Sequence, residues 1–445
     1  MFRRLFSPRA ARRSVLAGLA LAVTLALGGC DFDPVNPNAA DDADALGTRD
    51  GLLASAVGLQ RLYNVDAYAP LVLVPAVTAR EIAINRTLIN LEELEQGMGN
   101  LPNTNNSVGA LHSSLYRVMA LAQGVRQGAE TVPTVEPALR SGLVALASFY
   151  RAAAIGGLAQ NFTHVAVQAG PGAAFVPREQ AFAQAAALLA EAEQVLTATP
   201  PNAAFNATLP QGFNLLASVR AYRARYELFA GNFQAAIDAA DRVGTATSRF
   251  AYTDLAPNPI FNAFFVGTPS YAARENLGLP SVEPGDARVA IYTTPTPGGT
   301  STPNGFPTDP LAGFFAAGRP VALPTFLPGE LALIRAEALV RLGRLPEAVV
   351  QLNAVRTKTA AQDPFGVGAG LPPYAGAVTE AALLGEIYYQ RAAELYLQGL
   401  RLNDQRRLGQ PGPAAGNPFV RNRNFYPFPL QERINNPNTP ADPPV

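Results

Sequence analysis

The segments FAGNFQAA at residues 229–236 and RLGRLPEA at residues 341–348 share one spacing. In each, one residue separates a glycine from a large apolar residue, and an alanine follows three positions later. A glycine in the left-handed conformation commonly ends a helix, and a small residue lets the next helix approach closely. The spacing therefore predicts a helical hairpin around Gly231 and another around Gly343, similar to the turn of a tetratricopeptide repeat. Two generic helical hairpins would give the same short pattern.

Helix-like apolar spacing extends outward from these turns over most of the chain. It covers residues 52–63, 110–127, 143–158, 178–196, 219–243, 330–356 and 380–408. No segment shows a long period-two alternation of β-branched residues, so any sheet should be minor. We expect a predominantly all-α fold, namely an α-α superhelix of tetratricopeptide-like hairpins with long irregular loops.

Residues 251–328, between the two hairpins, are rich in Pro, Gly and Thr, and we expect a long loop insertion there. Loops of this length in compact domains are uncommon and are often functional. The segment also holds many aromatic residues, which a plain linker would not need: Tyr252, Phe261, Phe264, Phe265, Tyr271, Tyr292, Phe314 and Phe315.

The N-terminus reads as a secretory signal, with a basic head, a short apolar stretch at 15–27 and then LGGC at 27–30. LGGC resembles a bacterial lipobox, which implies cleavage after residue 29 and lipid attachment at Cys30. The alternative is an uncleaved signal anchor. Residues 30–45 are acidic and rich in Pro and Asn, which predicts a flexible tether rather than a calcium loop. We therefore expect a signal peptide at 1–29, a tether at 30–45 and a single helical domain at 46–445.

Composition excludes several classes of protein. The chain of 445 residues is 48% hydrophobic and 15% charged, with a formal net charge of +0, so we expect no nucleic-acid partner. Cys30 is the only cysteine, which removes cysteine metal sites and cysteine nucleophiles from the domain. We expect no metal and no cofactor.

The last third of the chain carries the most specific motifs. IYYQRAAEL at 387–395 leads into GLRLND at 399–404, and NFYPFPLQER at 424–433 is followed by NNPN at 435–438. If 380–408 were one helix, Arg391, Glu394 and Arg401 would share a stripe, and opposite charges three apart could pair. Asp286-Ala287-Arg288 and the alanine-rich LASFYR at 146–151 are further matches. Together these segments resemble the SusD/RagB family of surface lipoproteins.

The resemblance implies a protein anchored to the outer membrane at the cell surface, which binds nutrients without cleaving them. It implies a SusC-like TonB-dependent β-barrel as partner and a glycan or another bulky nutrient as ligand. We expect the ligand site to combine early loops with the long loop, because sugars bind to aromatic faces and hydrogen-bonding side chains. The candidate residues are Tyr68, Arg80, Arg86, Asn90, Tyr271, Arg274, Tyr292 and Phe314.

An enzyme and a scaffold protein are the two alternatives to a nutrient-capture protein. An enzyme would need catalytic groups: Glu92, Glu93 and Glu95 are expected to form a solvated helix face, and no G-x-S-x-G elbow accompanies the two histidines, His112 and His164. We expect no catalytic residues. A helical-repeat scaffold lipoprotein in envelope assembly would share the lipobox and the hairpins. It would not need the aromatic loop or the proline-rich tail, which favours capture.

Overall fold

The computed structural model describes residues 42–296, 299–414 and 416–445, and helices dominate them. The α-helices are α2 (Asp42–Gly47), α3 (Arg49–Arg61), α4 (Tyr68–Thr78), α5 (Ile89–Gln96), α6 (Asn106–Thr131), α7 (Pro137–Asn161), α8 (Arg178–Ala198), α9 (Ala203–Asn206), α10 (Leu215–Phe229), α11 (Phe233–Val243), α12 (Pro259–Phe265), α13 (Arg288–Tyr292), α14 (Gly313–Ala316), α15 (Pro328–Arg341), α16 (Leu345–Arg356), α17 (Glu380–Glu394), α18 (Arg401–Arg407) and α19 (Leu430–Asn435). Shorter or wider helical turns are η1 (Leu62–Ala67), η2 (Met98–Asn100), η3 (Glu275–Gly278) and η4 (Ala360–Gln362). The predicted predominance of helix is confirmed.

Local sequence explains where the long helices begin. The side chain of Asn105 accepts hydrogen bonds from the backbone N–H groups of Ser107 and Val108, which caps the start of α6. Pro137 occupies the first turn of α7, where its missing N–H costs no hydrogen bond. All seven stretches with helical spacing contain helices, although α4 and α5 were not among them.

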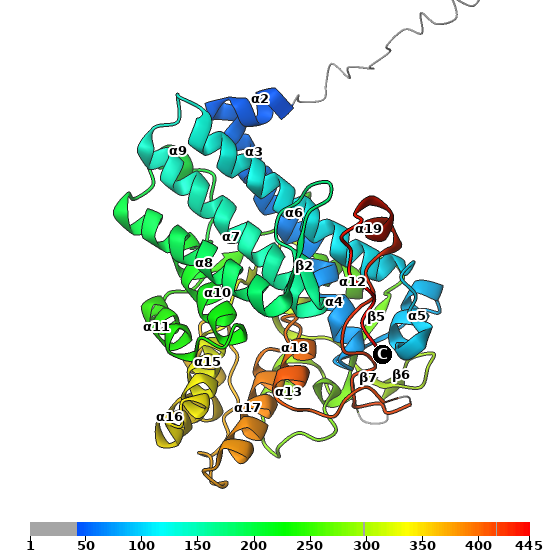
Figure 1. Ribbon diagram of the computed structural model, residues 1–445. Coiled ribbons are helices and arrows are strands. Elements are labelled where there is room, and N and C mark those ends of the chain that lie inside the picture. The colour runs from blue at the N-terminus through cyan, green and yellow to red at the C-terminus, as the bar shows by residue number, and fades with distance from the viewer. Residues whose placement is uncertain (1–41, 297–298, 415) are drawn as a thin grey trace, which may run out of the picture. The chain divides into compact units, whose positions relative to one another are not determined.

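The two glycine turns form as predicted. Gly231 joins α10 to α11 with a φ of 83°, and Gly343 joins α15 to α16 with a φ of 74°. Ala236 and Ala348 are fully buried at the close approach of each pair. The two hairpins are far apart in sequence, yet α11 packs against α15, and they lie side by side in Figure 1. They share one apolar cluster, so the tetratricopeptide-like units stack through tertiary contact.

Helix α7 lies at the centre of the N-terminal helices, with α6 and α8 packed against it. It is long and apolar enough to cross a membrane, but 94% of its apolar window is buried inside the protein. Its alanines and Gly156 let neighbouring helices approach, because the ring of Tyr226 fills the space that a side chain at 156 would occupy. The aromatic residues at 149 and 150 are completely buried, so the LASFYR segment is part of the core.

The stretch 380–408 is not one helix, which corrects the expected stripe of charges. Helix α17 ends at Glu394 and α18 begins at Arg401, because Leu397 and Gly399 adopt φ values of 53° and 70°. Arg391 therefore pairs across the turn, with its Nε 2.8 Å from Oδ2 of Asp404, instead of with a neighbour three residues away. The break folds α18 back beside α17.

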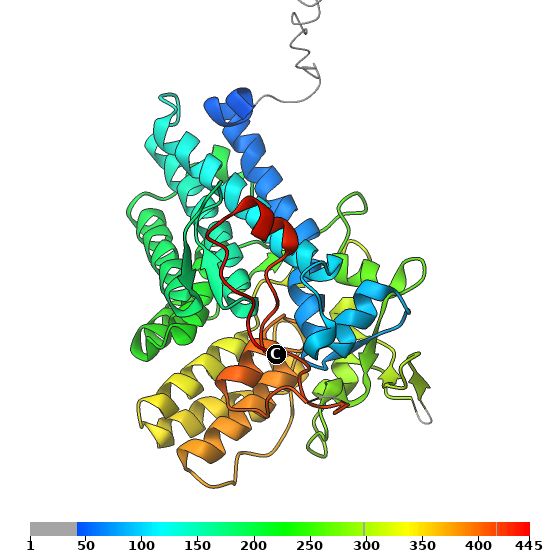
Figure 2. The same cartoon turned by 45° about the vertical axis from the view of Figure 1, so that its right-hand side comes forward.

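Residues 251–328 hold several short elements rather than one irregular loop. Strands β5 (Tyr271–Arg274), β6 (Thr300–Ser301) and β7 (Pro307–Asp309) join β1 (Ile82–Ile84) in an antiparallel sheet of order β1-β5-β7-β6. Two smaller sheets pair β2 (His164–Ala166) with β3 (Phe175–Pro177) and β4 (Arg249–Phe250) with β8 (Leu323–Pro324). Figure 2 shows the four-stranded sheet next to α5. The sheet content is small, as predicted, but this sheet connects the long segment to the early chain.

The C-terminal segment closes against the core. The hydroxyl of Tyr426 lies 2.8 Å from Oγ1 of Thr78, and the ring of Phe428 stacks on Phe162 at 5.7 Å. The segment thus crosses from α18 back to the N-terminal helices.

The predicted signal peptide, Cys30 and the tether up to residue 41 lie outside the described residues. Helix α2 begins at Asp42, so residues 42–45 of the expected tether are helical. The division into signal peptide, tether and a single domain at 46–445 remains a prediction.

Candidate functional site

A cavity of about 770 Å³ lies where the early chain, the long segment and the C-terminal segment meet. From the early chain it is lined by Arg80, Glu95, Gln96, Met98 and Asn100, from the long segment by Arg274, Glu275, Asn276, Leu279, Asn304, Gly305, Phe306 and Pro307, and from the C-terminal segment by Gly416, Pro418 and Phe419. Its volume is in the range of small-molecule binding sites. We call it the arginine cavity, because two arginines dominate its polar lining.

The pairing of β1 with β5 brings the two arginines together. Ile82 is opposite Ala273, so Arg80, just before β1, comes close to Arg274 at the end of β5. Nη1 of Arg274 donates to the carbonyl oxygen of Arg80 at 3.1 Å, and also to the carbonyl of Pro418. Nη1 of Arg80 donates to the carbonyl of Glu95 at 2.8 Å. Three distant parts of the chain are thereby linked around one cavity.

Aromatic rings cover the guanidinium groups. The ring of Phe306 lies 4.7 Å from the guanidinium carbon of Arg274 and 5.4 Å from that of Arg80. Phe419 approaches Arg274 at 5.3 Å. These distances fit cation–π contacts, which hold both rings and cations in place. The cavity therefore combines fixed aromatic rings with fixed hydrogen-bond donors.

Glu95 is a correction to the expected solvated face of α5. Its side chain is only 4% exposed, and its carboxylate accepts from the backbone N–H of Ile84 at 2.8 Å and from Nδ2 of Asn304 at 2.5 Å. Burial raises the pKa of Glu95 above its usual range, while the hydrogen bond from Asn304 opposes this shift. The three-glutamate run thus turns one carboxylate inward, because α5 packs that side against β1.

The electrostatics of the arginines follow from burial too. Burial lowers the pKa of Arg274 to about 10, and the neighbouring charge of Arg80 adds to this effect. Burial likewise lowers the pKa of Arg80. Both groups stay cationic at neutral pH, at the cost of desolvating two like charges close together.

Backbone strain concentrates at this cavity. Arg80, Met98, Asn276 and Leu277 have φ values between 48° and 65°, which residues other than glycine rarely adopt. Three of them line the cavity and Leu277 adjoins it. Gly278 comes so close to the backbone of Arg80 that an added Cβ would lie 2.0 Å from its carbonyl oxygen. Strained backbone persists where the surroundings hold it, and it is common at ligand sites.

The structure brings together only two of the eight candidate residues, Arg80 and Arg274. Arg86 and Asn90 are half-buried near α5, where Nδ2 of Asn90 donates to Oγ of Ser107. Tyr271 lies in β5 with its ring 6.2 Å from that of Phe264, and Phe314 packs edge-on against Tyr292. None of these residues lines the arginine cavity.

Tyr68 and Tyr292 are corrections, because both belong to the core. Tyr68 is 4% exposed and packs edge-on against Phe250. Tyr292 is completely buried, and its hydroxyl donates to the carbonyl of Glu394 at 2.7 Å. Tyr68 begins α4 and Tyr292 ends α13. Both residues were expected in loops, but both lie in helices that pack inward.

Sequence reasoning missed Glu95, Asn304, Phe306 and Phe419 as cavity residues. Asn304-Gly305-Phe306 follows the TTPTPGG run within the long segment, so its loop signal was visible. No feature of the sequence indicated that this loop would meet Arg80, because the β5–β7 pairing is a tertiary contact.

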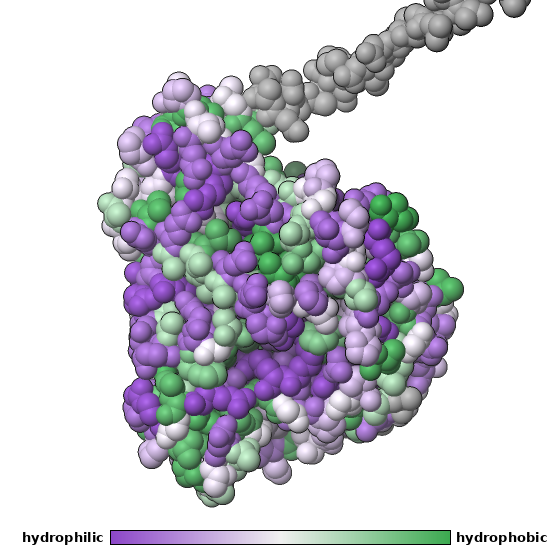
Figure 3. Space-filling model, viewed as in Figure 1, coloured by the Kyte–Doolittle hydropathy of each residue, from purple (hydrophilic) through white to green (hydrophobic). Residues whose placement is uncertain are grey.

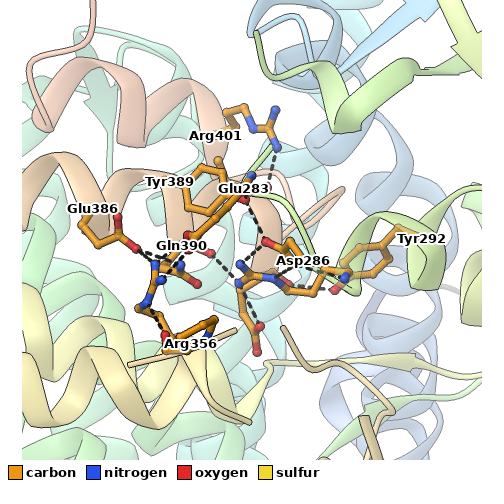
Figure 4. Close-up of polar contacts among 12 residues, drawn as sticks. Glu283, Asp286, Tyr292, Arg356, Glu386, Tyr389, Gln390 and Arg401 are labelled. Carbon is orange, nitrogen blue, oxygen red and sulfur yellow. Dashed lines mark hydrogen bonds and ion pairs between the residues drawn. The ribbon is translucent and has the colours of Figure 1, made fainter. Parts of the chain in front are cut away.

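The motifs behind the family resemblance serve mainly to hold the helices together. Asp286 accepts from Nε and Nη2 of Arg288, which is completely buried and also approaches Glu394 at 3.4 Å. Figure 4 shows Tyr389 donating to Asp286, and Arg356 lying between Glu283 and Glu386. This buried network joins α13, α16 and α17, so it positions the long segment and has no open cavity of its own.

Other parts of the surface offer weaker candidates. A cavity of about 560 Å³ between α6 and α19 is lined by His112, Tyr116, Arg117 and Glu432 among others. Figure 3 shows a hollowed hydrophilic area over α18 and the C-terminal segment. No group of three or more His, Cys, Asp or Glu side chains that could hold a metal ion occurs within the described residues.

No protein-family model and no curated protein matches the sequence. Solved structures do match the fold. A SusD superfamily protein from Bacteroides vulgatus matches with a TM-score of 0.66 at 16% identity, over 90% of this chain and 98% of that chain. A SusD-like carbohydrate binding protein from the same organism gives 0.64 at 14% identity, over 88% and 98%.

Surface glycan-binding protein A from Bacteroides fluxus gives a TM-score of 0.64 at 16% identity, over 89% of this chain and 98% of that chain. Because the agreement spans nearly the whole of each relative, the chain has the fold of the SusD superfamily.

Proposed function

We propose that this protein captures glycans in the arginine cavity and passes them to a TonB-dependent outer-membrane transporter. The observation that carries the proposal is the cavity itself: about 770 Å³ with fixed aromatic rings beside fixed polar donors. A sugar ring presents C–H groups to an aromatic face and hydroxyls around its edge. Phe306 and Phe419 would stack on the C–H groups of the sugar. Asn100, Asn304 and the two arginines would hydrogen-bond to its hydroxyls.

The names of structural relatives support this ligand class. One is a SusD-like carbohydrate binding protein and another a surface glycan-binding protein. The tryptophan that often stacks on sugars is absent from this sequence, so phenylalanine takes that role in our proposal.

The carboxylates of the cavity favour binding of a glycan without its hydrolysis. A glycosidase uses two carboxyl groups on either side of the scissile bond, about 5 to 10 Å apart and with separated pKa values. Both oxygens of Glu95 already accept hydrogen bonds from Ile84 and Asn304, and Glu275 is exposed to solvent. We therefore propose that bound glycan leaves the cavity intact.

The ligand site can be tested with Phe306→Ala in the full chain. Removing the ring should weaken glycan binding by about tenfold or more, which corresponds to about 1.4 kcal/mol. Affinity electrophoresis on a panel of polysaccharides would measure it. The matched control is Phe365→Ala, since Phe365 also carries a stacked arginine, Arg249, but does not line the cavity. Equal binding by Phe306→Ala and the parent would contradict the site.

The membrane part of the proposal rests on the lipobox-like LGGC ending at Cys30. A diacylated cysteine with a barrel partner would hold the protein at the outer membrane, because one acyl chain alone binds weakly. Cys30→Ser should move the protein out of the outer-membrane fraction, and a TonB-dependent barrel should co-purify with the parent. A Cys30→Ser variant that stays in that fraction would refute lipid anchoring.

A further inference from the structure

Within the described residues, the two arginines of the cavity have no carboxylate partner, unlike the ion-paired arginines of the core. Arg421 and Arg423 are also buried there without one, and they donate to backbone carbonyls and to Asn424. Arg225 lies 2.6 Å from Glu330, Arg391 2.8 Å from Asp404 and Arg288 2.6 Å from Asp286. In the part of the chain that the structure describes, no carboxylate oxygen lies within 4.0 Å of a guanidinium nitrogen of Arg80 or Arg274. Burying a charge without a partner of opposite charge is unfavourable, so these two cations destabilise the folded protein.

Their hydrogen-bond capacity is also largely unused. A guanidinium has five N–H donors, and each of these arginines engages only Nη1, with backbone carbonyls. The Nε atoms of both are buried without a partner. Neither Nη2 has an acceptor among residues 42–296, 299–414 and 416–445. Two guanidinium groups with spare donors therefore line one cavity at 5% and 3% exposure.

The acidic residues of the cavity do not neutralise this pair. The charge of Glu95 attracts both arginines, but it is one charge facing two cations, and its oxygens already accept from Ile84 and Asn304. Glu275 is exposed to solvent, where salt and water screen its charge. Burial and the charge of Arg80 lower the pKa of Arg274 to about 10, and the charge of Glu95 opposes this shift.

We infer that the glycan bound in the arginine cavity is acidic, and that an anionic group on its sugars, carboxylate or sulfate, pairs with Arg80 and Arg274. This inference rests on the proposed glycan-binding function and names the substrate class. The planar fork of a guanidinium matches two oxygens of a carboxylate or sulfate, which gives direction as well as charge. Phe306 holds both guanidinium groups by its ring and would contact the sugar beside the charged group.

The test compares each glycan with its uncharged counterpart, using the full chain. Polygalacturonate, alginate and hyaluronan are measured beside their carboxyl-reduced forms, and dextran sulfate beside dextran. At least one charged member should bind about tenfold or more tightly than its uncharged form, and this preference should fall with rising salt. The carboxylated and sulfated arms tell which anionic group is the source of the preference.

Arg80→Gln and Arg274→Gln should each remove the preference for the charged member. Arg274→Lys should keep part of it, because the charge stays while the fork is lost. Arg249→Gln is the matched control, since Arg249 stacks on Phe365 outside the cavity; it should bind like the parent. Circular dichroism on each variant checks that it is folded.

The outcomes separate the two proposals. If uncharged glycans bind as tightly as charged ones and Phe306→Ala weakens both, the glycan-binding function stands and the acidic specificity is overturned. If no polysaccharide of either kind binds the parent, the function itself fails and the inference fails with it. Loss of the charge preference in Arg249→Gln as well would also overturn the assignment of Arg80 and Arg274.

Discussion

Buried charged and titratable residues in this protein meet three different environments. Arg288 and Arg391 are paired with carboxylates, and Arg80 and Arg274 line a cavity without such partners. His112 lies between aromatic rings, with its Nε2 buried and unpartnered. The same desolvation cost therefore has different consequences: paired groups stabilise the fold, cavity groups are available to a ligand, and the histidine stays neutral.

His112 makes stability depend on pH. Burial lowers its pKa from 6.5 to about 3, so between these values the unfolded chain binds a proton that the native protein does not. Stability should then be complete above pH 6.5 and fall as the pH drops, by at most about 1.4 kcal/mol per pH unit. His112→Phe should flatten this slope in denaturant titrations at pH 7, 6, 5 and 4.

The matched control for that series is His164→Gln, which changes the other, partly exposed histidine. If the parent and His112→Phe lose stability at the same rate on acidification, the buried neutral state of His112 is wrong.

Glu394 is the centre of the buried charge network. It is completely buried, with one oxygen 2.6 Å from Nζ of Lys358 and the other 3.4 Å from Nη1 of Arg288. Glu394→Gln keeps the shape but leaves the buried Arg288 with Asp286 alone and the half-buried Lys358 with Asp363 alone, which should cost about 3 kcal/mol of unfolding free energy. Thermal melting would show it. Glu347→Gln, which changes a solvent-exposed pair with Arg344, should melt close to the parent.

At the level of elements, turns and breaks decide where the site forms. The turn η3, directly after β5, holds Asn276 and Leu277 at positive φ, and its Gly278 packs on the backbone of Arg80. The break between α17 and α18 lets Arg401 donate to the carbonyl of Leu277. The helical scaffold thus supports the strained turn from one side and the small sheet supports it from the other.

Gly278→Ala tests this coupling. Its φ is 73°, and its Cβ would overlap the carbonyl oxygen of Arg80, the same oxygen that accepts from Arg274. The variant should lose stability and glycan affinity together, because Arg80 must move. Gly231→Ala is the matched control: its φ is 83°, but no atom lies within 4 Å of its Cβ, so it should lose about 1 kcal/mol of stability and keep affinity. Normal affinity in Gly278→Ala would contradict the coupling.

Helices and turns could be predicted from the sequence better than the tertiary contacts between them. Glycine turns, caps and apolar spacing are local, which is why the hairpins at Gly231 and Gly343 were found. The break at Leu397 was missed because a leucine at positive φ has no local signal. Arg80 and Arg274 were named separately, whereas Phe306 and Glu95 became site residues only through the pairing of β1, β5 and β7. Tyr68 and Tyr292 were assigned to a surface because aromatic composition does not distinguish core from binding face.

On the scale of the whole molecule, the arginine cavity draws its lining from the early chain, the long segment and the C-terminal segment. Helix stacking, the buried network around Glu394 and the closing tail all serve to bring these three parts together. The proposed lipid anchor precedes all of them in sequence. The described fold thus surrounds one cavity with strained backbone, two buried arginines and aromatic rings, and we propose that this cavity binds glycan.

Hydrogen–deuterium exchange of the full chain, with and without a saturating polysaccharide, tests that claim most directly because it locates the bound ligand. If glycan binds in the arginine cavity, exchange should slow at residues 80–98, 274–279, 304–307 and 416–419 when glycan is present, with little change in α15 and α16. Slower exchange confined to other segments, such as 106–120 with 429–435 at the cavity between α6 and α19, would contradict it.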